Sequence, residues 1–276
     1  MTGGPRNPDL VSRRINAERV VVAGWTRAIL MQLAHPLVAA GVADHSTVRR
    51  SGITAVMRLH HKIRAMLALT FGDDRERRAA LDGIATIHRR VNGSLRHATG
   101  IFPAGTRYSA EDPDLVLWVH ATLLETIPLV YDLIVRPLPI AERDAYCAEA
   151  AAIACDLGAR ESDVPQTWQA TMTYLQATYR SGAIAVGLDA RELSAAVLAP
   201  PLGAISAPAA WVNRLLTAGL LPPVLREQYG MDWTHHRARS FDRLVTSLRA
   251  ARRLAPPMAA LWPEARRVSS RREASQ

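Results

Sequence analysis

A long apolar segment near the middle of the chain constrains the fold more than any other feature of the sequence. Asp112-Pro113 opens it with an N-cap residue followed by proline at the first helical position, which is a strong signal for a helix start. Residues 115–135 are apolar almost all round, and the pattern continues past Pro128. We therefore expect a buried helix at the centre of the molecule.

The same segment is long enough to span a bilayer. It contains His120, Glu125 and Asp132, and charged side chains at bilayer depth are costly. A soluble helical core can satisfy such groups from neighbouring helices, so we expect each of the three to have a polar partner inside the fold. This pattern predicts a soluble, cytoplasmic protein with no integral membrane segment.

Composition favours helix along the rest of the chain, since 49% of the 276 residues are hydrophobic and only 5% are aromatic. Glycine, proline and aspartate separate the helical patterns, and no sustained period-two strand pattern is found. The expected helices span about 17–42 with a break at Pro36, 47–70, 73–93, 113–137, 140–158, 165–181, 190–198, 207–218 and 233–253. Short loops between them predict one all-α globular domain around the central helix.

The two ends of the chain differ from this domain in composition. Residues 1–15 predict a flexible or loosely docked arm, residues 16–262 the helical domain, and residues 263–276 a disordered basic tail. The formal net charge of +9 comes almost entirely from arginine. No aromatic-interleaved basic patch or recognised nucleic-acid motif accompanies it, so we expect no nucleic-acid partner. No sequence pattern sets the oligomeric state.

The two cysteines, Cys147 and Cys155, fall on one expected helix. At about 1.5 Å rise per residue they lie about 12 Å apart, which is too far for a disulfide between them. No apolar segment of a signal peptide is visible near the start. Both features fit a reducing, intracellular compartment.

A histidine on an expected apolar helix face is the first candidate for chemistry. His88 lies within a stripe formed by Leu81, Ile84, Ile87 and Val91. A neutral imidazole on a core-facing stripe is a suitable iron ligand. The alternative, which periodicity alone favours, is a buried histidine satisfied by a carbonyl or a carboxylate.

The segment Arg58-Leu59-His60-His61-Lys62 is the second candidate, and Lys62 is the only lysine of the chain. Arg58 and Lys62 are i,i+4 neighbours on one helix flank, with His61 beside them. Functionally, these side chains would form the polar wall of a pocket. A solvated basic helix face is the alternative.

Four further polar side chains have open roles, namely His35, Asp44, His45 and His120. Asp44-His45-Ser46 could place a carboxylate and an imidazole near the same pocket, or could simply cap the start of the next helix. The central position of His120 predicts a buried, hydrogen-bonded ring. No phosphate-binding glycine loop, dinucleotide fingerprint, HExxH pair, covalent haem-attachment motif or nucleophile elbow is present.

Several short motifs follow one another in a specific order over residues 17–180. They are Ala34-His35-Pro36-Leu37-Val38-Ala39-Ala40-Gly41-Val42, Asp44-His45-Ser46, Arg58-Leu59, Phe71-Gly72, His88-x-x-Val91-x-Gly93, Tyr108-x-Ala110-x-Asp112-Pro113 and Trp118-Val119-His120-Ala121-Thr122-Leu123. In this order they resemble the catalytic domain of rubber oxygenases (latex-clearing proteins), shared with the endoplasmic-reticulum-bound oxygenase of mycophenolic acid biosynthesis. The chain is most similar to a short bacterial branch of that family.

The resemblance implies a helical protein that holds a non-covalent haem b on a proximal histidine and cleaves carbon–carbon double bonds with dioxygen. The proximal histidine falls on His88. On the distal helix Arg58 matches the family's arginine, whereas His61 stands where the family has lysine and Lys62 where it has threonine. The family's acidic catalytic residue falls on Asp44.

The expected function is therefore a haem-b-dependent oxygenase that acts on a hydrophobic small molecule with dioxygen, in a haem pocket between helices. His88 is the expected metal ligand. Arg58, His61 and Lys62 are expected on the distal side, where Arg58 also contacts the cofactor, and Asp44 is the fourth expected catalytic residue. The alternatives are a non-catalytic helical protein that binds haem or a lipid-like ligand, and a purely structural interaction protein.

Overall fold

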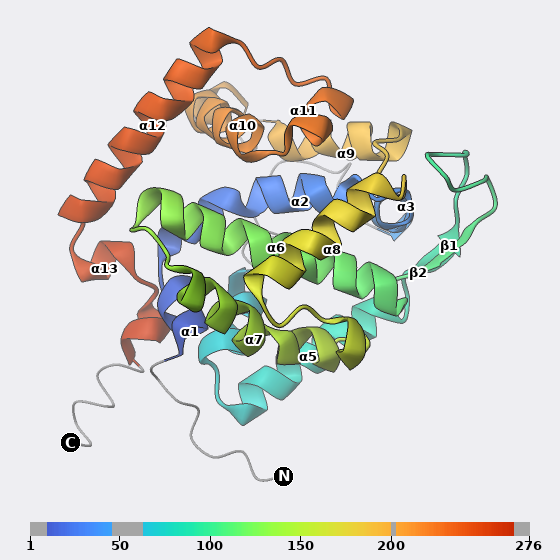
Figure 1. Cartoon of the computed structure of the whole chain (residues 1–276), viewed down its shortest axis with the longest axis horizontal. Coiled ribbons are helices and arrows are strands. Elements are labelled where there is room, and N and C mark those ends of the chain that lie inside the picture. Colours follow the sequence, from blue (N-terminus) through green and yellow to red (C-terminus); the bar gives the residue numbers. More distant parts are fainter. Residues whose placement is uncertain (1–9, 46–62, 200–202, 268–276) are drawn as a thin grey trace.

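The computed structural model describes residues 10–45, 63–199 and 203–267, and it confirms the all-α class (Figure 1). One long helix, α6 (Pro113–Ile134), lies at the centre. Elements from both halves of the chain pack on it, namely η1 (Arg19–Gly24), α2 (Trp25–Leu33), α7 (Ile140–Asp156), α8 (Trp168–Arg180) and α12 (His235–Leu254). The central placement of the apolar segment is thus confirmed.

The start and the packing of α6 follow from its sequence. The Asp112 side chain accepts a hydrogen bond from the backbone N–H of Asp114 at 2.9 Å, and Pro113 occupies the first turn. Most of the following residues are buried, and Trp118 is only 1% exposed. Burying a large apolar side chain contributes about 1.5–3 kcal/mol relative to leaving it exposed, so α6 is a main source of stability.

Two of the three polar side chains of α6 have the partners that a soluble core must supply. Glu125 accepts a hydrogen bond from Nη2 of Arg27 at 2.9 Å, and the Arg27 side chain is only 2% exposed. Asp132 accepts one from Nη2 of Arg143 at 2.8 Å. These two predictions are confirmed.

The prediction of a hydrogen bond for His120 is wrong. Its Nε2 atom is buried and has no hydrogen-bond partner in the part of the chain that the structure describes. Burial lowers the pKa of His120 to about 4, so its ring is neutral near neutral pH, which is the form that costs least to bury. Among the described helices, α6 is the one long and apolar enough to cross a membrane, and most of its apolar window is buried inside the protein.

The first helix begins within the range that the sequence assigns to a flexible arm. This helix, α1, spans Val11–Asn16. Ile15 is fully buried, and the backbone N–H of Ser12 donates to Glu149 on α7 at 2.7 Å. The packed domain therefore begins before residue 16, because a buried apolar side chain and hydrogen bonds to the Glu149 carboxylate hold this segment against α7.

Proline divides the next expected helix as predicted. Helix α2 ends at Leu33, and α3 (Pro36–His45) starts on the proline itself. Ahead of α2, the expected helix is replaced by the tighter η1 turn. Beyond α3, residues 63–71 are helical.

Helix α5 (Asp74–His88) begins with a capping box. The Asp73 side chain accepts from the backbone N–H of Glu76 at 2.8 Å, and the Glu76 side chain accepts from that of Asp73 at 3.0 Å. The helix ends at His88 rather than near residue 93. The expected start is confirmed, and the expected end is five residues too late.

A short antiparallel hairpin follows α5, where the sequence predicts no strand. It consists of β1 (Asn92–Ser94) and β2 (Arg107–Ser109), with Gly93 opposite Tyr108. Strands of three residues are too short to produce a period-two pattern, which is why the prediction fails here.

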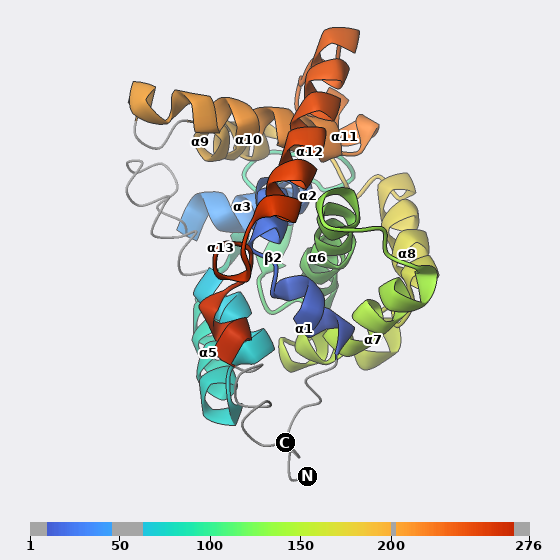
Figure 2. The same cartoon turned by 90° about the vertical axis from the view of Figure 1, so that its left-hand side faces the viewer.

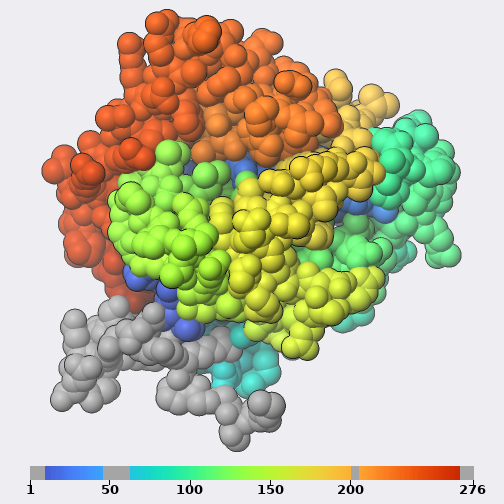
Figure 3. Space-filling view, in the orientation of Figure 1, coloured from blue at the N-terminus to red at the C-terminus, as the bar shows by residue number. Residues whose placement is uncertain are grey.

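The remaining elements are η3 (Glu161–Asp163), α9 (Leu188–Leu198), η4 (Gly203–Ser206), α10 (Ala207–Leu220), α11 (Pro223–Gln228) and α13 (Pro257–Ala260). Of these, α9 packs on α2 and α3, and α10 packs on α2. In the space-filling view the orange and red C-terminal elements make one continuous layer over the green and blue ones (Figure 3). Residues 263–267 are helical and Ala265 is buried, so the packed domain extends beyond the expected boundary at residue 262.

The cysteine prediction is confirmed. Both cysteines lie on α7 and both are free thiols. Cys147 is buried and Cys155 is half-buried, and burial raises the pKa of each thiol. Both therefore stay protonated at neutral pH, and neither is a reactive thiolate.

Candidate active site

The candidate iron ligand, His88, is the last residue of α5 and is half-buried. Burial lowers the pKa of its imidazole, and the nearby Glu111 carboxylate opposes this shift. The ring is therefore mainly neutral at physiological pH, which is the form that ligates a metal. Its side chain forms no hydrogen bond with another described residue, so its ring nitrogens are not engaged within that part of the fold.

The expected burial of the stripe around His88 is wrong. Helix α5 has no buried residue, and Ile87 is 63% exposed. Leu81 and Ile84 are half-buried. The helix lies at the margin of the molecule, below α7 in Figure 1, and its apolar side is only partly covered by the protein.

The other expected pocket wall falls outside the described residues. Arg58, His61 and Lys62 all belong to this gap, so their roles stay predictions. Residues 63–71 are helical and dock on α1, where the Asn16 side-chain amide donates to the Thr70 hydroxyl at 3.4 Å.

Asp44 lies near the end of α3, where two donors hold its carboxylate. The Tyr108 hydroxyl donates to Oδ2 at 2.6 Å, and the Arg96 guanidinium forms an ion pair with Oδ1. Burial and the bond to Asp44 raise the pKa of Tyr108, so this phenol stays protonated and acts as a donor. The two partners fix the orientation of a carboxylate whose side chain is 20% exposed.

Gly93 allows the Tyr108 ring to approach this close. A Cβ atom built on Gly93 would lie 2.5 Å from the Tyr108 hydroxyl oxygen, closer than side chains tolerate. Gly41 on α3 faces the same ring, where an added Cβ would lie 3.5 Å from Cε2. His45 completes the contact, since its Nε2 lies 2.9 Å from the backbone oxygen of Asn92. These contacts clamp the hairpin onto the end of α3.

The hairpin also connects Asp44 to His88. The backbone N–H of Val91 donates to the His88 carbonyl at 3.0 Å, and that of Ala110 donates to the Val91 carbonyl at 2.9 Å. Glu111, the residue after Ala110, is the carboxylate that acts on the His88 pKa. One short hairpin thus positions both candidate residues. The sequence analysis did not predict that Tyr108 and Arg96 would contact Asp44. The glycine at position 93, which pairs with Tyr108, is the sequence feature that could have indicated a close approach of the aromatic ring.

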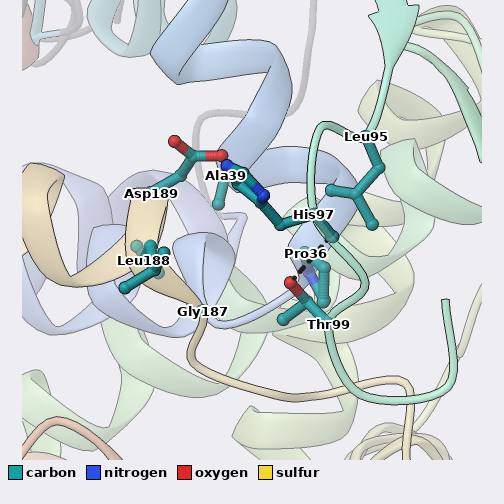
Figure 4. A pocket seen from close by; sticks show the side chains of 9 residues that line it. Pro36, Ala39, Leu95, His97, Thr99, Gly187, Leu188 and Asp189 are labelled. Atoms are coloured by element: carbon teal, nitrogen blue, oxygen red, sulfur yellow. Dashed lines mark hydrogen bonds between the residues drawn. The ribbon is translucent and has the colours of Figure 1, made fainter. Parts of the chain in front are cut away.

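A small hollow opens beside this hairpin, between α3 and the first turn of α9 (Figure 4). Its volume is about 280 Å³, including space open to solvent. Its lining residues are Pro36, Ala39, Leu95, His97, Thr99, Gly187, Leu188, Asp189 and Ala190. The Asp189 carboxylate of the hollow contributes to the raised pKa of Tyr108.

His35 is a structural residue in this arrangement. It is 7% exposed, its Nδ1 accepts from the backbone N–H of Leu37 at 3.3 Å, and its ring lies 5.2 Å from that of Phe102. Burial lowers the pKa of His35 to about 4, against the opposing charge of Asp112. Its neutral ring therefore caps the start of α3 and packs the loop after β1.

No cluster of three or more His, Cys, Asp or Glu side chains that could hold a metal ion is found in residues 10–45, 63–199 and 203–267. Within these ranges the site consists of one half-buried imidazole and one oriented carboxylate, joined by a hairpin inside a helical domain.

These features define a helical protein with a candidate metal centre that has one histidine ligand. Sequence comparison identifies its family. The chain belongs to the family described as "ER-bound oxygenase mpaB/B'/Rubber oxygenase, catalytic domain", whose sequence model matches residues 12–250. The expected family membership is thus confirmed, and the family is one of oxygenases.

Two mycobacterial proteins are similar to this chain over most of its length. It is 28% identical over 241 residues to an uncharacterized protein of Mycobacterium bovis and equally to one of Mycobacterium tuberculosis. The alignments cover 83% of this chain and 87% of each relative. No solved structure gives a significant match.

Proposed function

We propose that the protein is a haem-b-dependent oxygenase that acts on a hydrophobic small molecule with dioxygen. The observation that supports this most is the state of His88, a neutral, half-buried imidazole without a side-chain hydrogen bond to another described residue. Membership of an oxygenase family supports oxygenase chemistry.

The residues around His88 fit a tetrapyrrole. Such a cofactor needs one neutral nitrogen for its iron and an apolar surface for its face. Helix α5 offers both, since Ile87 is 63% exposed and Leu81 and Ile84 are half-buried beside the imidazole. Bound there, the haem would supply the dioxygen chemistry that amino-acid side chains lack.

The polar residues of the site have separate tasks in this proposal. Glu111 provides a negative charge that raises the pKa of the His88 imidazole and so increases its basicity. Asp44, fixed by Tyr108 and Arg96, offers an oriented carboxylate oxygen that can accept a proton from the substrate. Arg58, His61 and Lys62 are proposed to line the side of the pocket opposite His88, with Arg58 also contacting the cofactor.

The proposed setting is the cytoplasm. The ion pairs of Glu125 and Asp132 allow α6 to act as a core helix of a soluble protein. Recovery in the soluble fraction without detergent is expected. Recovery only with membranes after a high-salt wash would contradict this setting, because salt screens arginine-mediated surface attachment.

The test is an absorption spectrum of the freshly purified protein with a pyridine haemochrome assay. A Soret band and a haemochrome typical of haem b are expected, and both should be largely lost in His88→Ala while the helical circular dichroism stays. The control is His236→Ala, an exposed histidine of α12, which should keep the band. Purified protein that contains no chromophore would refute haem dependence. A reduced haem that does not react with dioxygen would refute oxygenase activity.

The distal side has its own test. His61→Ala should change the ferric spectrum or the affinity for imidazole, and Lys62→Ala should have a smaller effect. The opposite order would show that Lys62 takes the role of the family's lysine through a one-residue shift along the helix.

A further inference from the structure

Helix α12 crosses the outside of the molecule and faces the viewer in Figure 2. Its inner face is fixed by packing, with Val245 only 5% exposed and the Phe241 ring lying directly on Gly219, where a Cβ would clash. Arg252 strengthens this attachment through a two-bond ion pair with Glu18. The outer face is therefore presented in one defined orientation.

The outer face is strongly basic. The helix sequence HHRARSFDRLVTSLRAARRL contains six arginines and one acidic residue, Asp242. At about 100° per residue, Arg239, Arg243 and Arg253 fall within about 100° of one another around the helix axis. All three are exposed. Helix α5, DRERRAALDGIATIH, has three arginines and three acidic residues, so the charge on α12 is not the general pattern of this chain.

The side chains of the three outer arginines make no hydrogen bond or ion pair with any residue that the structure describes. The other arginines of the helix are partnered: Arg237 donates to the Asp232 carbonyl, Arg249 donates to the Leu133 carbonyl, and Arg252 pairs with Glu18. Asp242, which is also exposed, lies at the edge of the same sector, so the three outer arginines produce a strip with a net positive charge, which attracts an anionic partner.

Apolar side chains lie at the C-terminal end of this strip. Leu254, the last residue of α12, is 85% exposed, and Met258 on α13 is 70% exposed. Leu254 lies within the same exposed sector as Arg243. A helix face with arginines and exposed apolar side chains matches the interfacial region of a bilayer, where charge meets phosphate and apolar groups enter the acyl boundary. A nucleic-acid backbone offers no partner for the apolar pair.

We propose that the outer face of α12, together with Leu254 and Met258, is a docking surface for an anionic phospholipid bilayer. The contact is peripheral and reversible, with the arginines on lipid phosphates and the two apolar side chains in the interface. It would bring the oxygenase to the phase in which hydrophobic molecules dissolve. The surface itself does not depend on the haem assignment.

The first test is co-sedimentation of the full-length protein with vesicles. Phosphatidylcholine vesicles containing phosphatidylglycerol should retain the protein at low salt and release it at high salt, while pure phosphatidylcholine should retain little. Failure to bind the anionic vesicles at low salt overturns the proposal. Because this comparison uses the unaltered protein, no folding defect can confuse it, and its outcome is independent of haem content.

Charge-reversal variants test the surface itself. Arg239→Glu, Arg243→Glu and Arg253→Glu together should lower the affinity for anionic vesicles at least about 100-fold, from a loss of roughly a factor of five per arginine. The matched control reverses three exposed arginines on other helices, Arg75→Glu, Arg78→Glu and Arg180→Glu. Equal losses in both sets would mean that only the net charge acts, which overturns a docking surface on α12.

The last two experiments test the apolar pair, Leu254 and Met258, and nucleic acid as the competing partner. Leu254→Ser with Met258→Ser should weaken binding to anionic vesicles, whereas Ile101→Ser, at a residue 59% exposed on the hairpin loop, should not. Binding of duplex DNA that requires the same three arginines, without vesicle binding, would assign the strip to nucleic acid and overturn the proposal.

Discussion

Helices α6 and α5 start alike and lie in opposite environments. An aspartate N-cap opens each of them, Asp112 for α6 and Asp73 for α5. More than half of the residues of α6 are buried, whereas none of those of α5 is. Helix α6 stabilises the core and contains no accessible candidate for a metal ligand. Helix α5 ends on His88 and contributes little to the core. The proposed chemistry therefore lies on a helix that no buried residue fixes to the core.

This contrast separates two kinds of substitution. Changes in α6 should reduce the free energy of unfolding, because they remove buried contacts or leave buried charges. Changes in α5 should reduce cofactor binding with little effect on unfolding. Any change that has both effects equally would break the comparison.

The largest effect is expected for Glu125→Leu in α6. It leaves the Arg27 guanidinium, 2% exposed, without its carboxylate partner. An uncompensated buried charge costs about 3–5 kcal/mol in unfolding free energy, measurable by urea titration. Asp82→Leu, an exposed position on α5, is the control and should cost less than about 0.5 kcal/mol. Equal losses at the two positions would contradict the contrast.

The buried ring of His120 should make the core sensitive to acid. Its pKa is lowered from 6.5 to about 4, so the unfolded state binds more protons between these pH values. The stability from the neutral ring is present above pH 6.5 and lost as pH falls through about 4. The contribution is about 3 kcal/mol at about 1.4 kcal/mol per pKa unit.

Thermal unfolding of His120→Leu and the unaltered protein at several pH values measures this dependence. The variant should lose less stability between neutral pH and pH 4. His236→Leu on α12, where the histidine is exposed, is the matched control and should leave the profile unchanged. Parallel profiles for His120→Leu and the unaltered protein would refute the role given to this ring.

A smaller effect is expected at the hairpin. Tyr108→Phe removes the donor that holds Oδ2 of Asp44 at 2.6 Å and should cost about 1–2 kcal/mol of stability. Haem content should stay the same while turnover falls, because the carboxylate loses its orientation and not its charge. Loss of haem in this variant would show that the hairpin supports the cofactor and not the Asp44 carboxylate.

The smallest effect on unfolding is expected from the α5 cap. Asp73→Ala removes the capping box and should cost about 1 kcal/mol, with weaker haem retention as the helix frays. Thr167→Ala removes the cap of α8, where the hydroxyl accepts from Ala170 at 3.2 Å, and should cost a similar amount without change in haem affinity. Competition with apomyoglobin for the haem distinguishes the two. Equal haem retention in both variants would contradict the role of α5.

The sequence was sufficient for α6 and insufficient for α5, for physical reasons. The N-cap residue and the apolar segment of α6 are both formed by residues that are close in sequence, so the start and the burial of this helix can be predicted from them. Periodicity shows which side of α5 is apolar, but it cannot show whether the fold covers that side, and the burial of Ile87 was predicted wrongly. The bond between Tyr108 and Asp44 joins residues 64 positions apart, and no local pattern encodes such a contact.

The central claim is that His88 is the haem ligand, and chemical rescue tests it most directly. His88→Gly should bind haem poorly, and added imidazole should restore the Soret band because the free ring can occupy the place of the missing side chain. Imidazole should have no such effect on the haem content of the matched His97→Gly variant, in which an exposed histidine is removed. Full haem occupancy and an unchanged spectrum of His88→Gly without imidazole would contradict the claim.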